Sequence, residues 1–266
     1  MQTELELFLG SHTQAPQLNV RVFKTNSDKI SIVPITDLHY GARKHNAPLL
    51  RQYLSYIMNT PDCYAIGLGD YMENATRTSV GLGMYEEDIH FPQQYERLEE
   101  MLRPLAQAGK LLGLHTGNHE MRATLATGMD PVYMLAKSLC VPYLGYTAFH
   151  KWVVGDVTYK VLTVHGRSAA RSPSGRLNAL RNLRDIVQAD IYMMGHLHDR
   201  QVHKEAVYTI DDTDDSVKTA CRYYIITGSL LDWPESYADM MAMPPVRTGL
   251  VKIDLYSQVK VVDVKF

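Results

Sequence analysis

Five short polar segments along the chain could hold metal ions. In order they are Asp37-Leu38-His39, Gly69-Asp70, Gly117-Asn118-His119-Glu120, His165-Gly166 and Gly195-His196-Leu197-His198. They offer carboxylate, amide and imidazole groups without a thiolate, and the candidate ligands are Asp37, His39, Asp70, Asn118, His165, His196 and His198. This mixture favours Mn²⁺, Fe²⁺, Zn²⁺, Co²⁺ or Ni²⁺ over a structural zinc, and its size suits two divalent cations rather than one.

Each segment has a plainer explanation when it is taken alone. Asp37 could cap a turn, and His39 or His165 could be a buried histidine with an ordinary hydrogen-bond partner. Gly69-Asp70 and Gly117-Asn118 are good turn sequences, and Gly195–His198 could be a bare loop. All these explanations would have to hold together, so the ordered set predicts a two-metal site.

The segments mostly follow apolar runs that are typical of β-strands. We expect strands at Ile30–Thr36, Tyr64–Leu68, Leu111–Thr116, Val157–Val164 and Ile191–Met194, and helices at Ala47–Asn59, Gln93–Ala108, Pro131–Leu139 and Arg176–Gln188. After His198 the pattern changes to hairpins, with strands at Val202–Ile210, Cys221–Thr227, Gly249–Leu255 and Val259–Val264. Leu18–Phe23 could add one more strand. Without a repeat or a linker, residues 1–266 are predicted to form a single domain, in which residues 1–29 are an N-terminal extension and residues 71–91 a loop on the substrate side.

The ordered pattern D-x-H, G-D, G-N-H-E, a lone His and G-H-x-H resembles that of the calcineurin-like metallophosphoesterases, over about 160 residues from Asp37 to His198. The resemblance implies an α/β fold of two facing mixed β-sheets flanked by helices. It also implies that one metal is held by Asp37, His39, Asp70 and His198, and a second by Asp70, Asn118, His165 and His196. Asp70 would bridge the two ions, Mn²⁺ is the expected metal, and a hydroxide bound to the metals would attack phosphorus.

Two residues beside the ligand Asn118 are candidates for catalysis. The family does not use the histidine at position 119 as a ligand, so His119 could donate a proton to the leaving alkoxide or bind the transferring phosphoryl group. Glu120 could orient the site from behind.

Basic and polar residues near the motifs are candidates for substrate binding. Residues 167–184 carry five arginines and no Asp, Glu or Lys, a local charge of +5. Arg167, Arg171 and Arg176 could bind a phosphate oxyanion, whereas Arg181 and Arg184 are expected to pair with acidic neighbours on a solvated helix face. Asn74, Arg77 and Arg122 follow ligands closely and are further candidates.

Composition narrows the class of protein. The chain is 45% hydrophobic and 21% charged, with a net charge of −2, which is ordinary for a globular protein and gives no general affinity for nucleic acid or membranes. Three widely spaced cysteines are typical of reduced thiols rather than of a disulfide framework. No apolar run approaches the length of a membrane helix, and no signal peptide is apparent. We therefore expect a cytoplasmic protein, which could form a homo-oligomer.

The leading hypothesis is a binuclear metal-dependent phosphodiesterase that acts on a nucleotide or a nucleic-acid end. This substrate class also follows from a weaker resemblance to family members carried by bacteriophages and prophages. His119 favours a diester because its alkoxide leaving group gains most from a proton donor. A phosphomonoesterase or protein phosphatase is the alternative enzyme. A non-catalytic scaffold is the third reading, although scaffolds tend to lose the ligands and the histidine that are present here.

Overall fold

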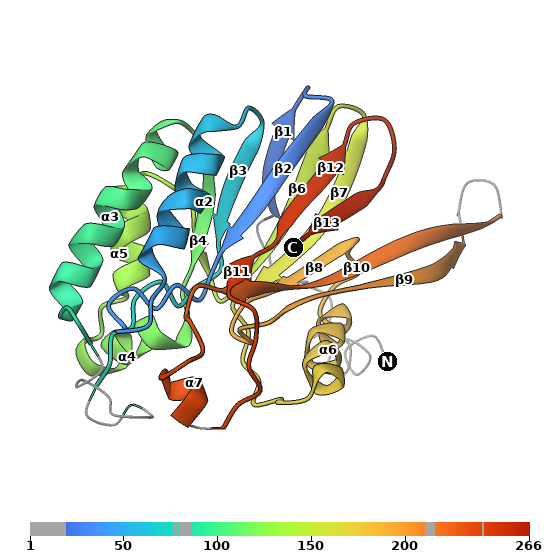
Figure 1. The fold of residues 1–266 in the computed structure, drawn as a ribbon. Helices are drawn as coiled ribbons and strands as arrows, with labels where there is room; N and C mark the ends of the chain where they lie inside the picture. The colour runs from blue at the N-terminus through green and yellow to red at the C-terminus, as the bar shows by residue number, and fades with distance from the viewer. Residues whose placement is uncertain (1–19, 77–78, 80–86, 211–215, 241) are drawn as a thin grey trace, which may run out of the picture.

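The computed structural model describes residues 20–76, 79, 87–210, 216–240 and 242–266. Two mixed β-sheets face each other, and helices cover the outer face of each (Figure 1). The α/β sandwich of two facing sheets flanked by helices, predicted from the sequence, is therefore confirmed. Among the described residues, no helix is both long and apolar enough to cross a bilayer.

The elements follow one another in a largely alternating order. The strands are β1 (Val20–Thr25), β2 (Lys29–Ile35), β3 (Cys63–Gly67), β4 (Leu111–His115), β5 (Tyr143–Gly145), β6 (Thr147–Val154), β7 (Val157–Val164), β8 (Ile191–Met194), β9 (Arg200–Ile210), β10 (Val217–Ser229), β11 (Gly249–Leu250), β12 (Lys252–Tyr256) and β13 (Val262–Lys265). The helices are α2 (Ala47–Asn59), α3 (Phe91–Gln107), α4 (Asn118–Thr127), α5 (Pro131–Ser138), α6 (Pro173–Arg181), a 3₁₀ turn (Asn182–Asp185) and α7 (Tyr237–Met240).

The two sheets place all the metal-binding motifs at one edge of the sandwich. In the first sheet the order is β13-β12-β2-β3-β4-β5, and β2, β3 and β4 run parallel. In the second the order is β1-β6-β7-β8-β10-β11, with β9 paired to β10 and with β7 parallel to β8. Since the carboxyl ends of parallel strands meet at the same edge, the loops after β2, β3, β4, β7 and β8 converge.

Three apolar clusters hold the layers together. The central cluster lies between the sheets and includes Ile32, Ile66, Trp152, Ile191 and Ile253, all almost fully buried. A second packs α2, α3 and α5 on the first sheet, and a third packs α6 on the second sheet. The ligand loops thus leave rigid, fully covered strands, which limits how far each ligand can move.

Several predicted elements differ from those observed. The helix predicted at Arg176–Gln188 instead begins at Pro173, because Ser172 caps it and proline suits its first turn, and it ends at Arg181. The strand predicted at Cys221–Thr227 is longer, and the last strand is Val262–Lys265 rather than Val259–Val264. Residues 18–19 of the predicted first strand lie outside the described residues. Strands β5 and β6 and helix α4 were not predicted.

Candidate metal centre

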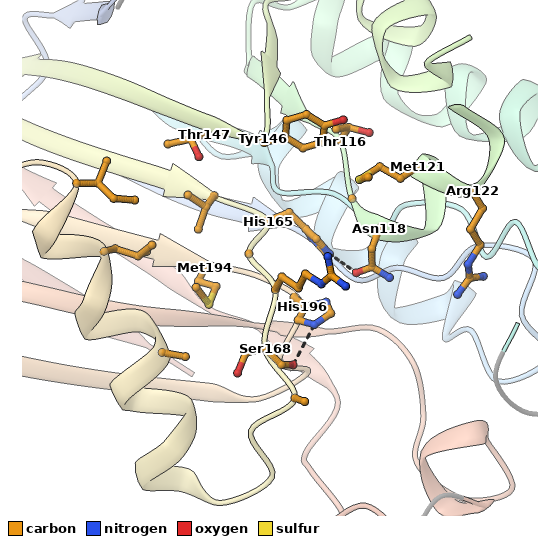
Figure 2. Close-up of a pocket in the computed structure, with 18 of the residues that line it drawn as sticks. Thr116, Asn118, Met121, Arg122, Tyr146, Thr147, His165, Ser168, Met194 and His196 are labelled. Atoms are coloured by element: carbon orange, nitrogen blue, oxygen red, sulfur yellow. Dashed lines mark hydrogen bonds between the residues drawn. The ribbon is translucent and has the colours of Figure 1, made fainter. Parts of the chain in front are cut away.

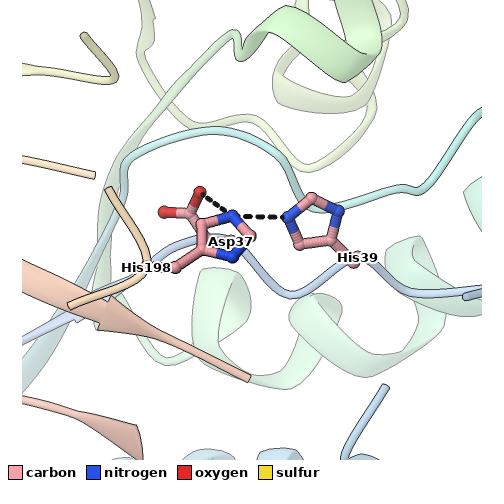
Figure 3. A group of neighbouring side chains, drawn as sticks. All are labelled: Asp37, His39 and His198. Atoms are coloured by element: carbon pink, nitrogen blue, oxygen red, sulfur yellow. Dashed lines mark hydrogen bonds and ion pairs between the residues drawn. The ribbon is translucent and has the colours of Figure 1, made fainter. Parts of the chain in front are cut away.

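Asp37, His39 and His198 form one group of metal-ligating atoms (Figure 3). His198 Nε2 lies 3.0 Å from His39 Nε2 and 3.2 Å from Asp37 Oδ1. The other carboxylate oxygen, Oδ2, accepts hydrogen bonds from Thr36 Oγ1 and from the backbone N–H of His196. Oδ1 is buried, and within the described part of the chain it accepts no hydrogen bond. A buried carboxylate oxygen that faces two imidazole nitrogens is well placed to bind a cation.

Asp70, His165 and His196 form a second group beside the first. His165 Nε2 lies 3.3 Å from Asp70 Oδ2 and 3.0 Å from Asn118 Oδ1. Asp70 also belongs to a third group with His39 and His119. Its carboxylate is therefore close both to His39, a member of the first group, and to His165 and His196 of the second. The structure therefore brings together all seven ligands predicted from the sequence, with Asp70 in the shared position.

Hydrogen bonds on the far side of three rings fix which nitrogen can bind a metal. Nδ1 of His165 contacts the carbonyl oxygen of Leu68 at 2.7 Å, and Nε2 of His196 contacts that of Ser168 at 3.1 Å. A carbonyl only accepts, so these nitrogens carry a hydrogen, and the opposite nitrogen of each ring is the one that could bind a metal. Nδ1 of His39 bonds the carboxylate of Glu73 at 2.8 Å, the usual way in which a protein orients a metal-binding imidazole.

The ligands occupy strained backbone conformations. Asp37, His39, Asp70, His196 and His198 have φ angles of 47°, 49°, 52°, 64° and 52°. Residues other than glycine rarely adopt this left-handed region, and such strain is concentrated at functional sites. The strained conformations turn side chains from three separate loops, those after β2, β3 and β8, toward one point.

The ionisation of the group suits divalent cations. Burial alone would raise the pKa of Asp70, but the imidazoles of His165 and His119 lower it well below its usual value. Burial lowers the pKa of His39 to about 3. Burial also opposes a proton on His165, but Asp70 outweighs it and raises the pKa of His165 to about 10. Anionic carboxylates and neutral imidazoles are the forms that bind metal, and a cation would replace the proton that Asp70 attracts to His165.

Glu120 ties two ligand loops together from behind. Its carboxylate accepts hydrogen bonds from the backbone N–H groups of Asp70, Tyr71, Met72 and Gly117, at 2.7–3.0 Å. The side chain is fully buried. Glu120 therefore positions Asp70 relative to α4 and does not reach the open side of the site. This position agrees with the orienting role that the sequence predicts for Glu120.

Gly117 permits the close approach of these two loops. A Cβ atom at this position would lie 2.1 Å from Asp70 Oδ1 and 2.2 Å from the Asp70 nitrogen. Because these contacts are far shorter than van der Waals distances, only glycine fits where the loops after β3 and β4 meet.

His119 lies at the edge of the ligand group. Its Nδ1 donates to the carbonyl oxygen of Glu73 at 2.7 Å, and its Nε2 lies 3.1 Å from Arg122 Nη2 and 3.9 Å from Asp70 Oδ2. Burial lowers its pKa to about 4. Since the carbonyl fixes the hydrogen on Nδ1, Nε2 is the atom that can exchange a proton with a group at the site.

Glu73 is a site residue that sequence reasoning did not identify. Its carboxylate oxygens lie 2.8 Å from His39 Nδ1, 3.6 Å from His119 Nδ1 and 3.9 Å from Arg122 Nη1. It follows Gly69-Asp70 closely, and an acidic residue just past a ligand was the available signal. Glu73 links a metal ligand, the proposed proton donor and an arginine.

The predicted substrate-binding residues lie in different surroundings. Arg122 and Arg167 line a pocket of about 770 Å³ beside Asn118, His165 and His196 (Figure 2). Arg171 lines a smaller one of about 210 Å³ next to His198. Arg77 lies outside the described residues.

Two of the predicted substrate contacts, Arg176 and Asn74, are buried against protein partners, and Arg122 donates to the backbone carbonyl oxygens of Glu73 and Asn74 at 3.1 and 3.3 Å. Arg176 is only 7% exposed and pairs with Asp199 at 2.7 Å, so the exposed phosphate-binding role expected for it is replaced by one that fixes α6 near the metal loops. Asn74 is buried and donates to the carbonyl oxygen of His119 at 2.7 Å, which positions that loop. Arg181 and Arg184 both lie near Glu205, as expected for a charged helix face.

Comparison with known proteins gives a distant structural likeness. Vps29 from Chaetomium thermophilum matches with a TM-score of 0.39 and 15% sequence identity, over 90% of this chain and 96% of that one. No protein-family model matches the sequence, and no curated protein matches it.

Proposed function

We propose that this protein is a metal-dependent phosphoesterase, and more narrowly a binuclear phosphodiesterase that acts on a nucleotide or on the end of a nucleic acid. The observation that carries the proposal is the convergence of seven candidate metal ligands, Asp70 among them, with His119 beside them. Two divalent cations, most simply Mn²⁺, fit a donor set of carboxylate, amide and imidazole. Its proposed place of action is the cytoplasm.

The residues divide the work of hydrolysis among them. Asp37, His39, Asp70 and His198 would hold one cation, and Asp70, Asn118, His165 and His196 the other. Bound cations would stabilise the charge that develops on the phosphoryl oxygens. His119 Nε2 would carry the proton that passes to the leaving oxygen, while its Nδ1 stays bonded to the carbonyl of Glu73. Arg122 Nη2 lies 3.1 Å from that Nε2. Its guanidinium group would bind a phosphoryl oxygen, and its positive charge would disfavour a proton on the His119 imidazole before substrate binds.

A diester is the better substrate for this arrangement. An alkoxide leaving group is a strong base, so its departure depends on a proton donor, whereas a good leaving group departs without one. Removal of His119 should therefore slow poor leaving groups more than good ones. This dependence distinguishes a proton donor from a residue that only supports the loop.

The test is hydrolysis by metal-stripped protein to which Mn²⁺ is returned. Bis-p-nitrophenyl phosphate should be hydrolysed faster than p-nitrophenyl phosphate, and His119→Ala should lose about 10²–10⁴-fold in kcat on alkyl esters. His90→Ala, an exposed histidine at the start of α3, is the matched control and should keep full activity. A preference for the monoester would favour a phosphatase. No turnover with any divalent metal would refute the enzyme and favour a non-catalytic scaffold.

A further inference from the structure

A pocket of about 770 Å³ opens directly from the metal-ligating side chains (Figure 2). Asn118, His165 and His196 are part of its lining. A water molecule occupies about 30 Å³, so the pocket holds far more than a phosphoryl group. The pocket is therefore large enough for a group that is attached to the reacting phosphorus.

Apart from the candidate metal ligands, most of the residues that line this pocket are apolar. Its lining includes Met121, Leu125, Tyr146, Val164, Ile186 and Met194. Val164 and Met194 are buried, whereas Leu125, Tyr146 and Ile186 are 80%, 57% and 54% exposed. Large apolar side chains left exposed around a concave surface mark a binding site more often than a structural one.

The charges near the pocket indicate what its occupant is attached to. Arg122 and Arg167 line it together with the metal ligands, and both are cationic. An uncharged apolar molecule would form no ion pair with these arginines. A bare phosphate would leave the apolar lining exposed to water. An occupant with an anionic phosphoryl end and an apolar body satisfies both parts.

We propose that the pocket between α4, α6 and the ends of β7 and β8 seats the aromatic ring of an ester group that stays on the phosphoryl group while the leaving group departs. This inference rests on the proposed phosphoesterase function. A ring suits the site because Tyr146 offers an aromatic face and the thioethers of Met121 and Met194 make favourable contacts with rings. An aryl ester and a nucleobase share this chemistry, and they differ in how far the ring lies from phosphorus.

The experiment compares p-nitrophenyl diesters that share a leaving group and differ in the second group. In each, a water oxygen bonds to phosphorus, the bond from phosphorus to the p-nitrophenyl oxygen breaks, p-nitrophenolate leaves, and the proton of the water passes to the solvent. The second groups are methyl, phenyl and 5′-thymidyl. We expect kcat/KM for phenyl or thymidyl to exceed that for methyl by about 10-fold or more, since apolar contacts of this size discriminate to that extent. A gain for phenyl alone indicates an aryl ester, and a gain for thymidyl alone indicates a nucleobase. A methyl ester that is hydrolysed as fast as both would overturn the proposal.

Substitutions at the rim tie the preference to this pocket. Leu125→Ser and Ile186→Ser change exposed side chains, so the fold should survive, and each should reduce the ratio of ring ester to methyl ester several-fold. Met129→Ser is the matched control, because Met129 is 59% exposed just beyond α4 and does not line the pocket. An unchanged ratio in both rim variants would place the ring elsewhere and contradict the proposal.

A binding measurement separates failure of this inference from failure of the proposed function. Calorimetry with phenylphosphonate and methylphosphonate, on Mn²⁺-loaded protein, should give about 10-fold tighter binding of the phenyl compound even if no ester is hydrolysed. Tighter phenyl binding without turnover refutes the enzyme and supports the pocket. Turnover with equal binding of the two phosphonates supports the enzyme and refutes the pocket.

Discussion

Removing the carboxylate of Glu73 should weaken metal binding without unfolding the protein. Glu73 bonds Nδ1 of His39 at 2.8 Å, and His39 is fully buried. A hydrogen bond to a charged group contributes about 1.5–3 kcal/mol, equivalent to about 10- to 100-fold in a dissociation constant. Residues that orient metal-binding histidines commonly show losses of the same size. We therefore expect Glu73→Ala to raise the Kd for Mn²⁺ by about 10- to 100-fold.

Two variants and one control make this prediction quantitative. Glu73→Gln keeps an oxygen that can accept from Nδ1 but loses the charge, so its Kd should lie between those of the native protein and Glu73→Ala. Glu100→Ala, on the exposed side of α3, should leave the Kd unchanged. Metal-stripped proteins are titrated with Mn²⁺ by calorimetry, and their thermal unfolding is checked. If Glu73→Ala unfolds normally and binds Mn²⁺ within about twofold of the native protein, Glu73 does not orient His39 for a metal.

Three further perturbations test the site and the fold. Gly117→Ala should abolish tight Mn²⁺ binding, because its Cβ would lie 2.1 Å from Asp70 Oδ1; calorimetric affinity near the native value would contradict the close approach. Removing metal with a chelator should lower the unfolding temperature, since a ligand at about 100 times its Kd adds about 2.7 kcal/mol to the free energy of unfolding. The unfolding temperature of Asp70→Asn should not change when the chelator is added. A decrease as large as that of the native protein would exclude Asp70 as a ligand. Burial lowers the pKa of His115 to about 3 and that of His150 to about 4, both below the usual 6.5. The unfolded chain therefore takes up protons first, so stability is complete above about pH 6.5 and falls toward pH 4, by at most about 1.4 kcal/mol per pH unit for each histidine. Denaturant unfolding at about pH 7 and pH 5 should show this loss, and His150→Gln should reduce it; no difference between the two proteins would contradict the assignment.

The sequence allowed us to predict which candidate ligands would lie together, because most of them lie just after a strand that is visible as an apolar run. Asp37, Asp70 and Asn118 follow three parallel strands, and His165 and His196 follow two more. Because neighbouring strands run parallel, the residues that follow them lie at the same edge of each sheet. The local sequence was therefore enough to predict this cluster.

The contacts that sequence reasoning missed depend on three-dimensional neighbours. Glu73 meets His39 across 34 positions, and Arg176 meets Asp199 across 23. An acidic partner for Arg176 turns a predicted phosphate contact into a buried ion pair, and nothing in residues 167–184 shows it. Strand β6 is a different case. Burial alternates along Thr147–Val154, but the residue types do not, because Phe149 and Val153 lie on its more exposed side and His150 on its buried side.

The pairing of β12 with β2 has a consequence for how the protein is made. β2 leads into Asp37, yet its neighbour β12 comes after His198, the last ligand in the chain. A nascent polypeptide that already carries every ligand therefore still lacks the strand that completes the sheet beneath Asp37. The sheet beneath Asp37 is therefore complete only after residues beyond His198 have left the ribosome. We therefore expect metal binding to follow synthesis, so that the identity of the bound ion would depend on which ions are available as well as on the chemistry of the donors.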